Sequence, residues 1–248
     1  MTRELLDRRV LGAVAFLDAA TRARVLEPLA VRAEGARLAR TRRGLYVVFD
    51  APGLKAHTRA FDAPPSEPAR GSAPVTLEVS DPAGRYVARR YTLRLPLDPD
   101  PANTNLPGSL FNPSEVTLFP SPSAGTRPGW ALVRATVVAA DGGGPLGGAL
   151  LRVKRLPEGT LIARGMSDAR GEALVVVPGI PLVTFGDGDE VTEKTISVSL
   201  RAVYDPEAGE VADPDDLEAR RGALPSHSFD RSLSSGRVLA ATFAVPLP

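Results

Sequence analysis

Three acidic residues, Asp187, Asp189 and Glu190, lie within the short segment Phe185–Glu190. Carboxylate oxygens are the ligands that Ca²⁺ prefers, so a group this dense could hold the ion. The segment lacks the Asp-x-Asp-x-Asp-Gly spacing and the distant bidentate Glu of a calcium-binding loop. We therefore interpret it as a solvated turn between strands, and we expect no metal and no other cofactor.

The chain contains two histidines, His57 and His227, and no cysteine. A metal centre needs several ligands within about 2.0–2.2 Å of one ion, and Ser-His-Asp or Cys-His catalysis needs a histidine beside its nucleophile. Each half of the chain has one histidine, in a segment whose composition predicts a solvent-exposed polar loop. The sequence therefore predicts no catalytic residue, no metal site and no enzyme activity.

Five arginines crowd one predicted hairpin of the first half. A phosphate-binding surface would use such a cluster, preferably with aromatic side chains for stacking. Only Tyr46 is near, and the acidic Glu34 interrupts the cluster. We interpret the cluster as a charged exposed face rather than a nucleic-acid site, with an acidic protein partner as the next alternative; it consists of Arg32, Arg37, Arg40, Arg42 and Arg43.

Length and composition indicate a soluble globular chain of two domains. The 248 residues are 43% hydrophobic, enough for each half to bury a core without disulfides. Residues 1–104 carry 17 basic against 12 acidic side chains, and residues 105–248 carry 13 against 17. Net charges of +5 and −4 could favour head-to-tail self-association, or record uneven surface decoration.

The N-terminus has some features of a secretion signal, because Arg8 and Arg9 precede the apolar run Val10–Leu17. Glu4 and Asp7 interrupt the basic region, however, and the short run alternates as a strand does. No segment approaches the roughly 20 apolar residues that span a bilayer. We expect a cytoplasmic protein, alone or as part of a released particle.

Alternating and apolar runs between turn residues predict an all-β chain. In the second half, Asp141–Gly148 and Ser167–Gly171 are rich in turn-forming residues, and we expect each to close a hairpin. In the second turn, Asp168 can open the reversal and Gly171 can supply the positive φ that closes it. The runs flanking these turns are 132–140 with 149–153, and 161–166 with 172–177.

The strand pattern of the second half repeats that of the first, which predicts a duplicated sandwich. Residues 44–54 align with 171–180, and 74–84 align with 195–209. Residues 91–99 align with 241–248 at the end of the chain. The predicted domains are 1–98 and 130–248, joined by the connector 99–129.

Eight prolines between Pro96 and Gly129 predict an extended, stiff connector without helix. Residues 110–111 and 116–119 of the connector are more apolar than a free linker requires. Strand Glu172–Val177 is also apolar on both faces, whereas a sandwich covers only one. We expect the second cover to be the sister domain, the connector or a partner, and predict partner contacts at Leu110, Phe111, Val116, Leu118, Phe119, Leu174 and Val176.

A loop insertion at 205–236 distinguishes the second copy from the first. Within it, the sequence 214–222 predicts a short helix with Asp213 as N-cap and proline at the first helical position. Acidic residues in the first turn, arginine in the last and glycine beyond it agree with the helix dipole and with termination.

The order of residues from Val133 through the turn Gly142–Gly148 to Ser167-Asp168 and Pro178-Gly179 resembles the carboxypeptidase-regulatory-like, transthyretin-like (prealbumin-like) β-sandwich. This resemblance implies two tandem Ig-like or prealbumin-like sandwiches. Hydroxyisourate hydrolases of this group end in Tyr-Arg-Gly-Ser, which this chain lacks. Similar intradiol dioxygenases use two Tyr and two His on iron, and isopeptide-forming relatives need an Asn on the last strand, which is also missing here.

These observations favour a non-enzymatic structural or adaptor component of a large protein assembly, held through sheet edges and the connector. The arrangement is similar to small accessory proteins of phage-tail-like contractile injection particles. The alternative is a ligand- or carbohydrate-binding accessory module, which would group exposed aromatic side chains on one face. The expected partners are protein subunits, with neither nucleic acid nor a membrane span.

Overall fold

A computed structural model describes residues 9–59, 64–180, 183–185, 191–193 and 195–248. The chain divides into two compact units. The predicted domain boundaries, after residues 98 and 129, divide the chain into consecutive segments. In the structure, two short pieces of the first half belong to the second unit. The first unit comprises the described parts of Met1–Leu17, Arg24–Val79 and Arg90–Val116; the second comprises Asp18–Ala23, Ser80–Arg89 and the described parts of Thr117–Pro248.

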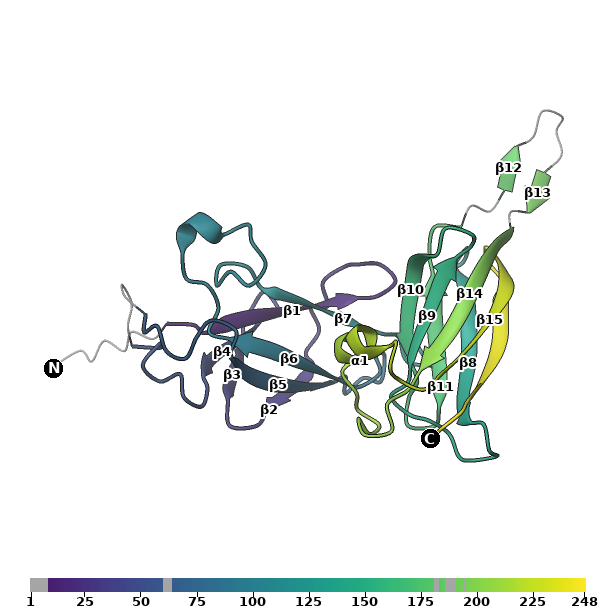
Figure 1. Ribbon diagram of the computed structural model, residues 1–248. Helices are drawn as coiled ribbons and strands as arrows, with labels where there is room; N and C mark the ends of the chain where they lie inside the picture. The colour runs from purple at the N-terminus through teal and green to yellow at the C-terminus, as the bar shows by residue number, and fades with distance from the viewer. Residues whose placement is uncertain (1–8, 60–63, 181–182, 186–190, 194) are drawn as a thin grey trace. The chain divides into compact units, whose positions relative to one another are not determined.

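Among the described residues, each sandwich has seven strands in two sheets, which confirms the predicted all-β class with two tandem β-sandwiches (Figure 1). The first has sheets β3-β4-β1-β7 and β2-β5-β6. Its strands are β1 Gly12–Asp18, β2 Ala30–Ala33, β3 Arg37–Arg40, β4 Tyr46–Asp50, β5 Ala73–Ser80, β6 Arg89–Leu95 and β7 Ser114–Leu118.

The second sandwich has sheets β11-β8-β16 and β10-β9-β14-β15, and a separate two-stranded sheet pairs β12 with β13. Its strands are β8 Ala131–Ala139, β9 Leu150–Arg155, β10 Thr160–Met166, β11 Glu172–Val177, β12 Val183–Phe185, β13 Val191–Glu193, β14 Thr195–Val203, β15 Ser226–Ser234 and β16 Val238–Val245.

The two sandwiches share the same strand arrangement except at the third strand. Strands β1–β4 correspond to β8–β11, and β5–β7 correspond to β14–β16. The third strand alone differs, because β3 pairs with β4 whereas β10 pairs with β9 and so joins the opposite sheet. This shared order supports the duplication inferred from the sequence.

Both predicted hairpins of the second half are wrong as pairings. β8 and β9 lie in opposite sheets, and so do β10 and β11. Only single bridges, Val138 with Pro145 and Ser167 with Ala173, join the ends of these strands. Turn residues reverse the chain but do not choose a sheet partner, and here β8 and β9 pair with β16 and β14 from the end of the chain.

The connector is more structured than the sequence predicts. It contains a 3-10 turn, η1 Pro101–Asn103, whose N-cap Asp100 accepts a hydrogen bond from the Ala102 N–H at 2.9 Å. It also contains β7, which lies beside β1 as β16 lies beside β8. Aligning residues 91–99 with the last strand is therefore wrong, because β6 pairs with β5 and corresponds to β15. β15 itself lies inside the predicted loop insertion. Its sequence is mostly polar, so the hydrophobic pattern did not indicate a strand there.

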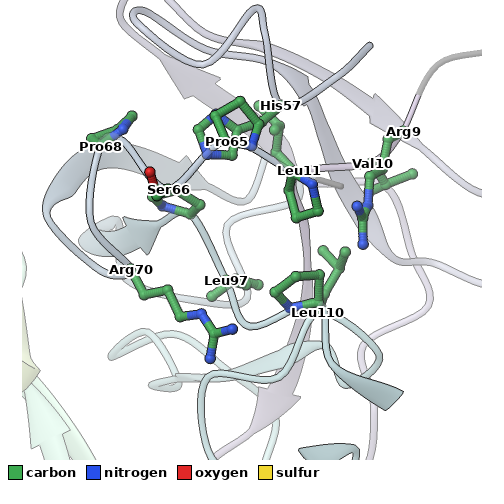
Figure 2. A pocket seen from close by; sticks show the side chains of 13 residues that line it. Arg9, Val10, Leu11, His57, Pro65, Ser66, Pro68, Arg70, Leu97 and Leu110 are labelled. Atoms are coloured by element: carbon green, nitrogen blue, oxygen red, sulfur yellow. The ribbon is translucent and has the colours of Figure 1, made fainter. Parts of the chain in front are cut away.

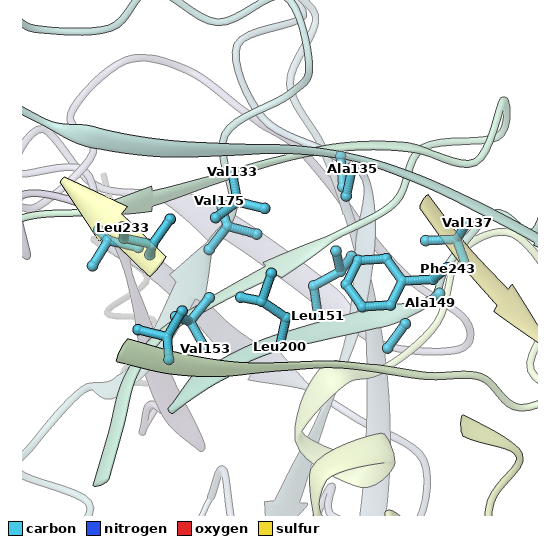
Figure 3. Close-up of a cluster of buried hydrophobic side chains, with 14 of the residues drawn as sticks. Val133, Ala135, Val137, Ala149, Leu151, Val153, Val175, Leu200, Leu233 and Phe243 are labelled. Carbon is cyan, nitrogen blue, oxygen red and sulfur yellow. The ribbon is translucent and has the colours of Figure 1, made fainter. Parts of the chain in front are cut away.

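The main core of the second unit lies between its two sheets (Figure 3). Val133 and Val175 of one sheet face Leu151 and Leu200 of the other, and each is at most 2% exposed. Phe243 of β16 fills the space beside Leu151 and Ala149 (Figure 3). Alternate side chains of each strand supply this layer, as the strand period requires.

Both outer faces of the second unit also carry buried apolar clusters. Leu174 and Val176 of β11 pack with Ala20, and Ala124 and Trp130 lie against the same cluster. On the opposite outer face, Leu150, Met166 and Val203 pack with Val87, Phe119, Ala212 and Leu217. The second cover that β11 requires therefore comes from residues 18–23 and the end of the connector.

The predicted helix is confirmed as α1, Pro214–Arg220. The Asp213 side chain accepts a hydrogen bond from the Asp215 N–H at 3.0 Å, so it caps the helix as predicted. Leu217 points into the outer cluster and is 1% exposed. The helix is short, and packing on the sheet holds it more than its own hydrogen bonds do.

The turn before β11 depends on Gly171, as the sequence predicts. Its φ is +72°, and its N–H donates to the Asp168 carbonyl at 2.8 Å. A Cβ added there would lie 2.4 Å from the Val137 carbonyl oxygen, whereas one added at Gly142, with a φ of +73°, would meet nothing within 4 Å.

We predict that Gly171→Ala lowers the free energy of unfolding by ~3 kcal/mol or more, because it adds a backbone clash to the left-handed penalty. Gly142→Ala should cost only the penalty of about 1 kcal/mol. Urea unfolding of both variants measures the difference. Equal costs would mean that the close approach at Gly171 has no energetic weight.

Candidate interaction site at a sheet edge

β16 is an edge strand without charged residues or proline. The Arg237 carbonyl accepts from the Leu132 N–H at 3.0 Å, and the Val245 carbonyl accepts from the Ala140 N–H at 2.9 Å. Since a strand points its backbone groups alternately to either side, those of the even-numbered residues face away from β8. Val238, Ala240 and Thr242 are exposed, so the edge presents their N–H and C=O groups to solvent.

Charges protect the other edges of the described sheets with three or more strands. Edge strands with charged side chains resist pairing with other chains. Every other edge strand of these sheets has at least one charged side chain, so β16 alone is unprotected. The charged residues are Arg32 on β2, Arg37 and Arg40 on β3, Arg90 and Arg94 on β6, Glu115 on β7, Arg164 on β10, Glu172 on β11, and Asp230 and Arg231 on β15.

His227 closes the far end of this edge. Its Nδ1 accepts a hydrogen bond from the Ala244 N–H at 3.1 Å. Its ring lies 5.6 Å from that of Phe229 and 6.2 Å from that of Phe243, centroid to centroid. The open stretch is therefore limited to Val238–Thr242, which we call the open edge.

Most of the predicted partner-contact residues are buried by the chain itself, in the outer clusters of the second unit or between two sheets. Val116, Leu118 and Phe119 are each 1% exposed, and Leu174 and Val176 are 0% and 6% exposed. In this fold the chain's own segments cover these five. Phe111 is 51% exposed and Leu110 is half-buried, so a partner could reach only these two, and their partner contact stays a prediction.

The prediction of two exposed loop histidines is wrong. His227 lies on β15 and is half-buried, and His57 is 5% exposed. The loop after β4 turns as a helix does, with the Thr58 N–H donating to the Leu54 carbonyl at 3.3 Å. Leu54, His57 and Thr58 consequently face inward together, and this i, i+3, i+4 spacing was the available signal.

The other candidate clusters form no chemical site among the described residues. All five arginines of the predicted charged face are exposed. Asp187, Asp189 and Glu190 lie outside the part of the chain that the structure describes. Within that part, no three His, Asp or Glu side chains gather as metal ligands would.

The two arginines that hold α1 in place, Arg89 and Arg152, were not predicted from the sequence. Arg89 is 0% exposed; its guanidinium donates to the Thr117 carbonyl at 2.7 Å and to the Asp215 carboxylate at 2.7 Å. Arg152, 5% exposed, donates twice to Glu218, at 2.7 and 2.8 Å. Arg152 lies on the outer face of β9, and Arg89 is the first residue of β6. Both guanidinium groups are buried, so each needs a charged partner, which α1 supplies.

Asp215 links the helix to two arginines, because Arg164 also donates to it at 3.4 Å. Burial acts to raise the pKa of Asp215, but the charges and hydrogen bonds of Arg89 and Arg164 outweigh it and lower the pKa below its usual value. Since the folded pKa is lower than the unfolded one, folding favours the ionised form. This stabilisation is present above the unfolded value of about 3.9 and is lost as the pH falls through the folded pKa.

We predict that Asp215→Asn lowers stability at pH 7 and flattens the loss of stability between about pH 5 and pH 2, by at most the uptake of one proton. Asp141→Asn, which removes an exposed carboxylate that forms no ion pair with any described residue, is the control and should retain the wild-type acid limb. Urea unfolding as a function of pH tests this. An unchanged acid limb in Asp215→Asn would contradict the assigned role of the ion pair.

No helix of the described residues is both long and apolar enough to cross a membrane. No protein-family model matches the chain, and no curated protein matches it. Solved structures with some similarity include the TIE protein of Bacillus anthracis, at 11% identity and a TM-score of 0.29, covering 96% of this chain and 34% of that one. BcpA, the major pilin subunit of Bacillus cereus, has 10% identity and a TM-score of 0.28, with 97% and 60% covered.

The shaft pilin SpaA of Lactobacillus rhamnosus GG has 10% identity and a TM-score of 0.23, with 70% of this chain and 68% of that chain covered. This chain therefore spans about a third of the TIE protein and three fifths of BcpA. At these scores the similarity does not assign a family.

Proposed function

We propose that this protein is a structural or adaptor component of a larger protein assembly, and that a neighbouring subunit adds a strand to the open edge of β16. The observation that carries this proposal is the uncharged edge with the exposed backbone groups of Val238, Ala240 and Thr242. Backbone pairing supplies the affinity in such strand addition, and alternate side-chain contacts supply the specificity.

The length of the open edge limits the partner. His227 occupies the Ala244 N–H, so an added strand has about five residues to pair with. Ala240 and Thr242 of the open edge lie on the outer face of the sheet, beside Arg134 and Thr136 of β8. The side chains of Ala240 and Thr242 are small. A partner strand with small or β-branched side chains and an acidic residue near Arg134 would fit this surface best.

The proposal includes a non-enzymatic role, a carboxypeptidase-regulatory-like origin of both sandwiches, and cytoplasmic assembly. The setting we propose is a phage-tail-like contractile injection particle, on the grounds of the sequence resemblance given above. Leu110 and Phe111 form a second proposed contact surface, and the opposite net charges of the two halves would favour self-association.

We predict that Thr242→Lys and Ala240→Pro each weaken partner binding at least tenfold. Lysine blocks edge pairing and proline removes one edge N–H that has no partner within its own sheet. Ser197→Lys is the matched control, because Ser197 is an exposed residue of a central strand, β14, in the opposite sheet. It should bind as the wild type does.

The measurement is quantitative mass spectrometry of complexes recovered from the native host through tagged variants, with sedimentation of the purified protein to detect self-association. Stoichiometric recovery of tube or sheath proteins, lost in the two edge variants, supports the proposed particle. Recovery that falls equally in Ser197→Lys, or does not fall in any variant, would exclude the edge as the contact.

A further inference from the structure

The first unit contains a cavity of about 360 Å³, whose wall shares only Leu110 with the contact surfaces proposed above (Figure 2). This volume lies within the usual range of small-molecule sites. Five proline rings form much of its wall, together with Leu11, Leu97 and Leu110. Because proline rings are rigid, the cavity is preformed and a ligand would order little of the chain on binding.

Among the described residues of the cavity wall, the charged side chains are all basic. Arg9 and Arg70 line it, and no described Asp or Glu does (Figure 2). Arg70 pairs with Asp98 at 2.6 Å, and its side chain remains 62% exposed. Asp98 has two further donors, the Asp100 N–H at 3.0 Å and the Asn103 side-chain amide at 2.8 Å. Arg70 could therefore turn to an anion without leaving Asp98 unpaired.

His57 supplies the second observation that points to a ligand. It belongs to the cavity wall, is 5% exposed, and neither ring nitrogen has a hydrogen-bond partner. Buried polar atoms are almost always paired, so an unpaired imidazole beside a cavity indicates a missing partner. A ligand that drew one ring N–H toward the cavity would supply the partner that neither nitrogen has.

We propose that this cavity binds an apolar carboxylate, with the hydrocarbon part against the proline and leucine side chains and the carboxylate held by Arg9, Arg70 and His57. Guanidinium groups match carboxylates in charge and in planar geometry. A carbohydrate fits poorly, since the described part of the wall offers only one hydroxyl group, Ser66, and no Phe, Tyr or Trp on which a sugar could stack. An inorganic anion would leave the apolar wall unfilled.

The carboxylate could belong to a free small molecule or to the C-terminal residue of a peptide. Calorimetric titration of the full chain with octanoate tests the first source, and an N-acetylated tripeptide ending in leucine tests the second. We expect at least one of them to bind one-to-one with a Kd below ~1 mM, and octanamide or the peptide amide to bind at least tenfold more weakly. Equal binding of acid and amide, or binding of neither acid, would overturn the proposal.

Variants distinguish this site from general adsorption. Arg9→Gln/Arg70→Gln should weaken binding of the acid at least tenfold, and Leu110→Trp should block it by filling the cavity. Arg32→Gln, at an exposed arginine of β2 outside the wall, should leave it unchanged. Full binding by Leu110→Trp, or an equal loss in Arg32→Gln, would show that the ligand lies elsewhere.

His57→Phe separates a ligand contact from a purely structural histidine. Replacing an unpaired imidazole with an apolar ring should raise Tm. If the imidazole donates to the carboxylate, the same variant should bind octanoate or the peptide acid about tenfold more weakly. A higher Tm with unchanged affinity would remove His57 from the site, and binding by the double arginine variant at wild-type strength would remove the site itself.

Discussion

The second unit is organised by strands that are buried on both faces. β9 and β11 bury one face in the central core and the other in an outer cluster. A two-sheet sandwich covers only the inner faces, so additional segments must cover the outer ones. Residues 18–23, 80–89, the end of the connector and α1 supply those covers, which is why pieces of the first half are counted with the second unit. The burial of Phe119, Leu174 and Val176 follows from this constraint.

Polar contacts determine where the covers lie. An apolar cover can slide over an apolar face, but Arg89 and Arg152 each need a carboxylate at a particular position. Asp215 and Glu218, three residues apart on α1, lie on the same side of the helix and reach these two arginines. The helix is therefore held at a fixed place on the sheet, and its cap, Asp213, contacts Arg89 as well, at 3.3 Å. These ion pairs contribute more to the position of the helix than to net stability, since desolvation offsets much of their attraction.

Local signals in the sequence identified α1, its cap, the Gly171 turn and most strands of the second half, because capping, positive φ and alternation are properties of neighbouring residues. The pairing of strands could not be predicted in the same way. β8 and β9 have partners about a hundred and about fifty residues later in the chain, and turn composition contains no information about them. β15 was missed because an edge strand needs few apolar residues, and the open edge was missed because it exists only once the sheet order is known. Arg89 and His57 resemble surface residues in sequence, and only the fold shows that both are buried.

The open edge is short, which limits pairing between two copies of the chain. An uncharged edge strand is ordinarily a risk for uncontrolled pairing. Here His227 occupies one end, Arg237 and Pro246 flank the strand, and the exposed side chains are only Val238, Ala240 and Thr242. Two such edges pairing with each other would bury few side chains, so the backbone bonds alone would have to offset the entropy of association. A partner that adds contacts beyond the edge, on the outer face beside Arg134, would bind much more strongly than a second β16. A short, uncharged edge thus favours pairing with a specific partner strand over pairing with a second β16.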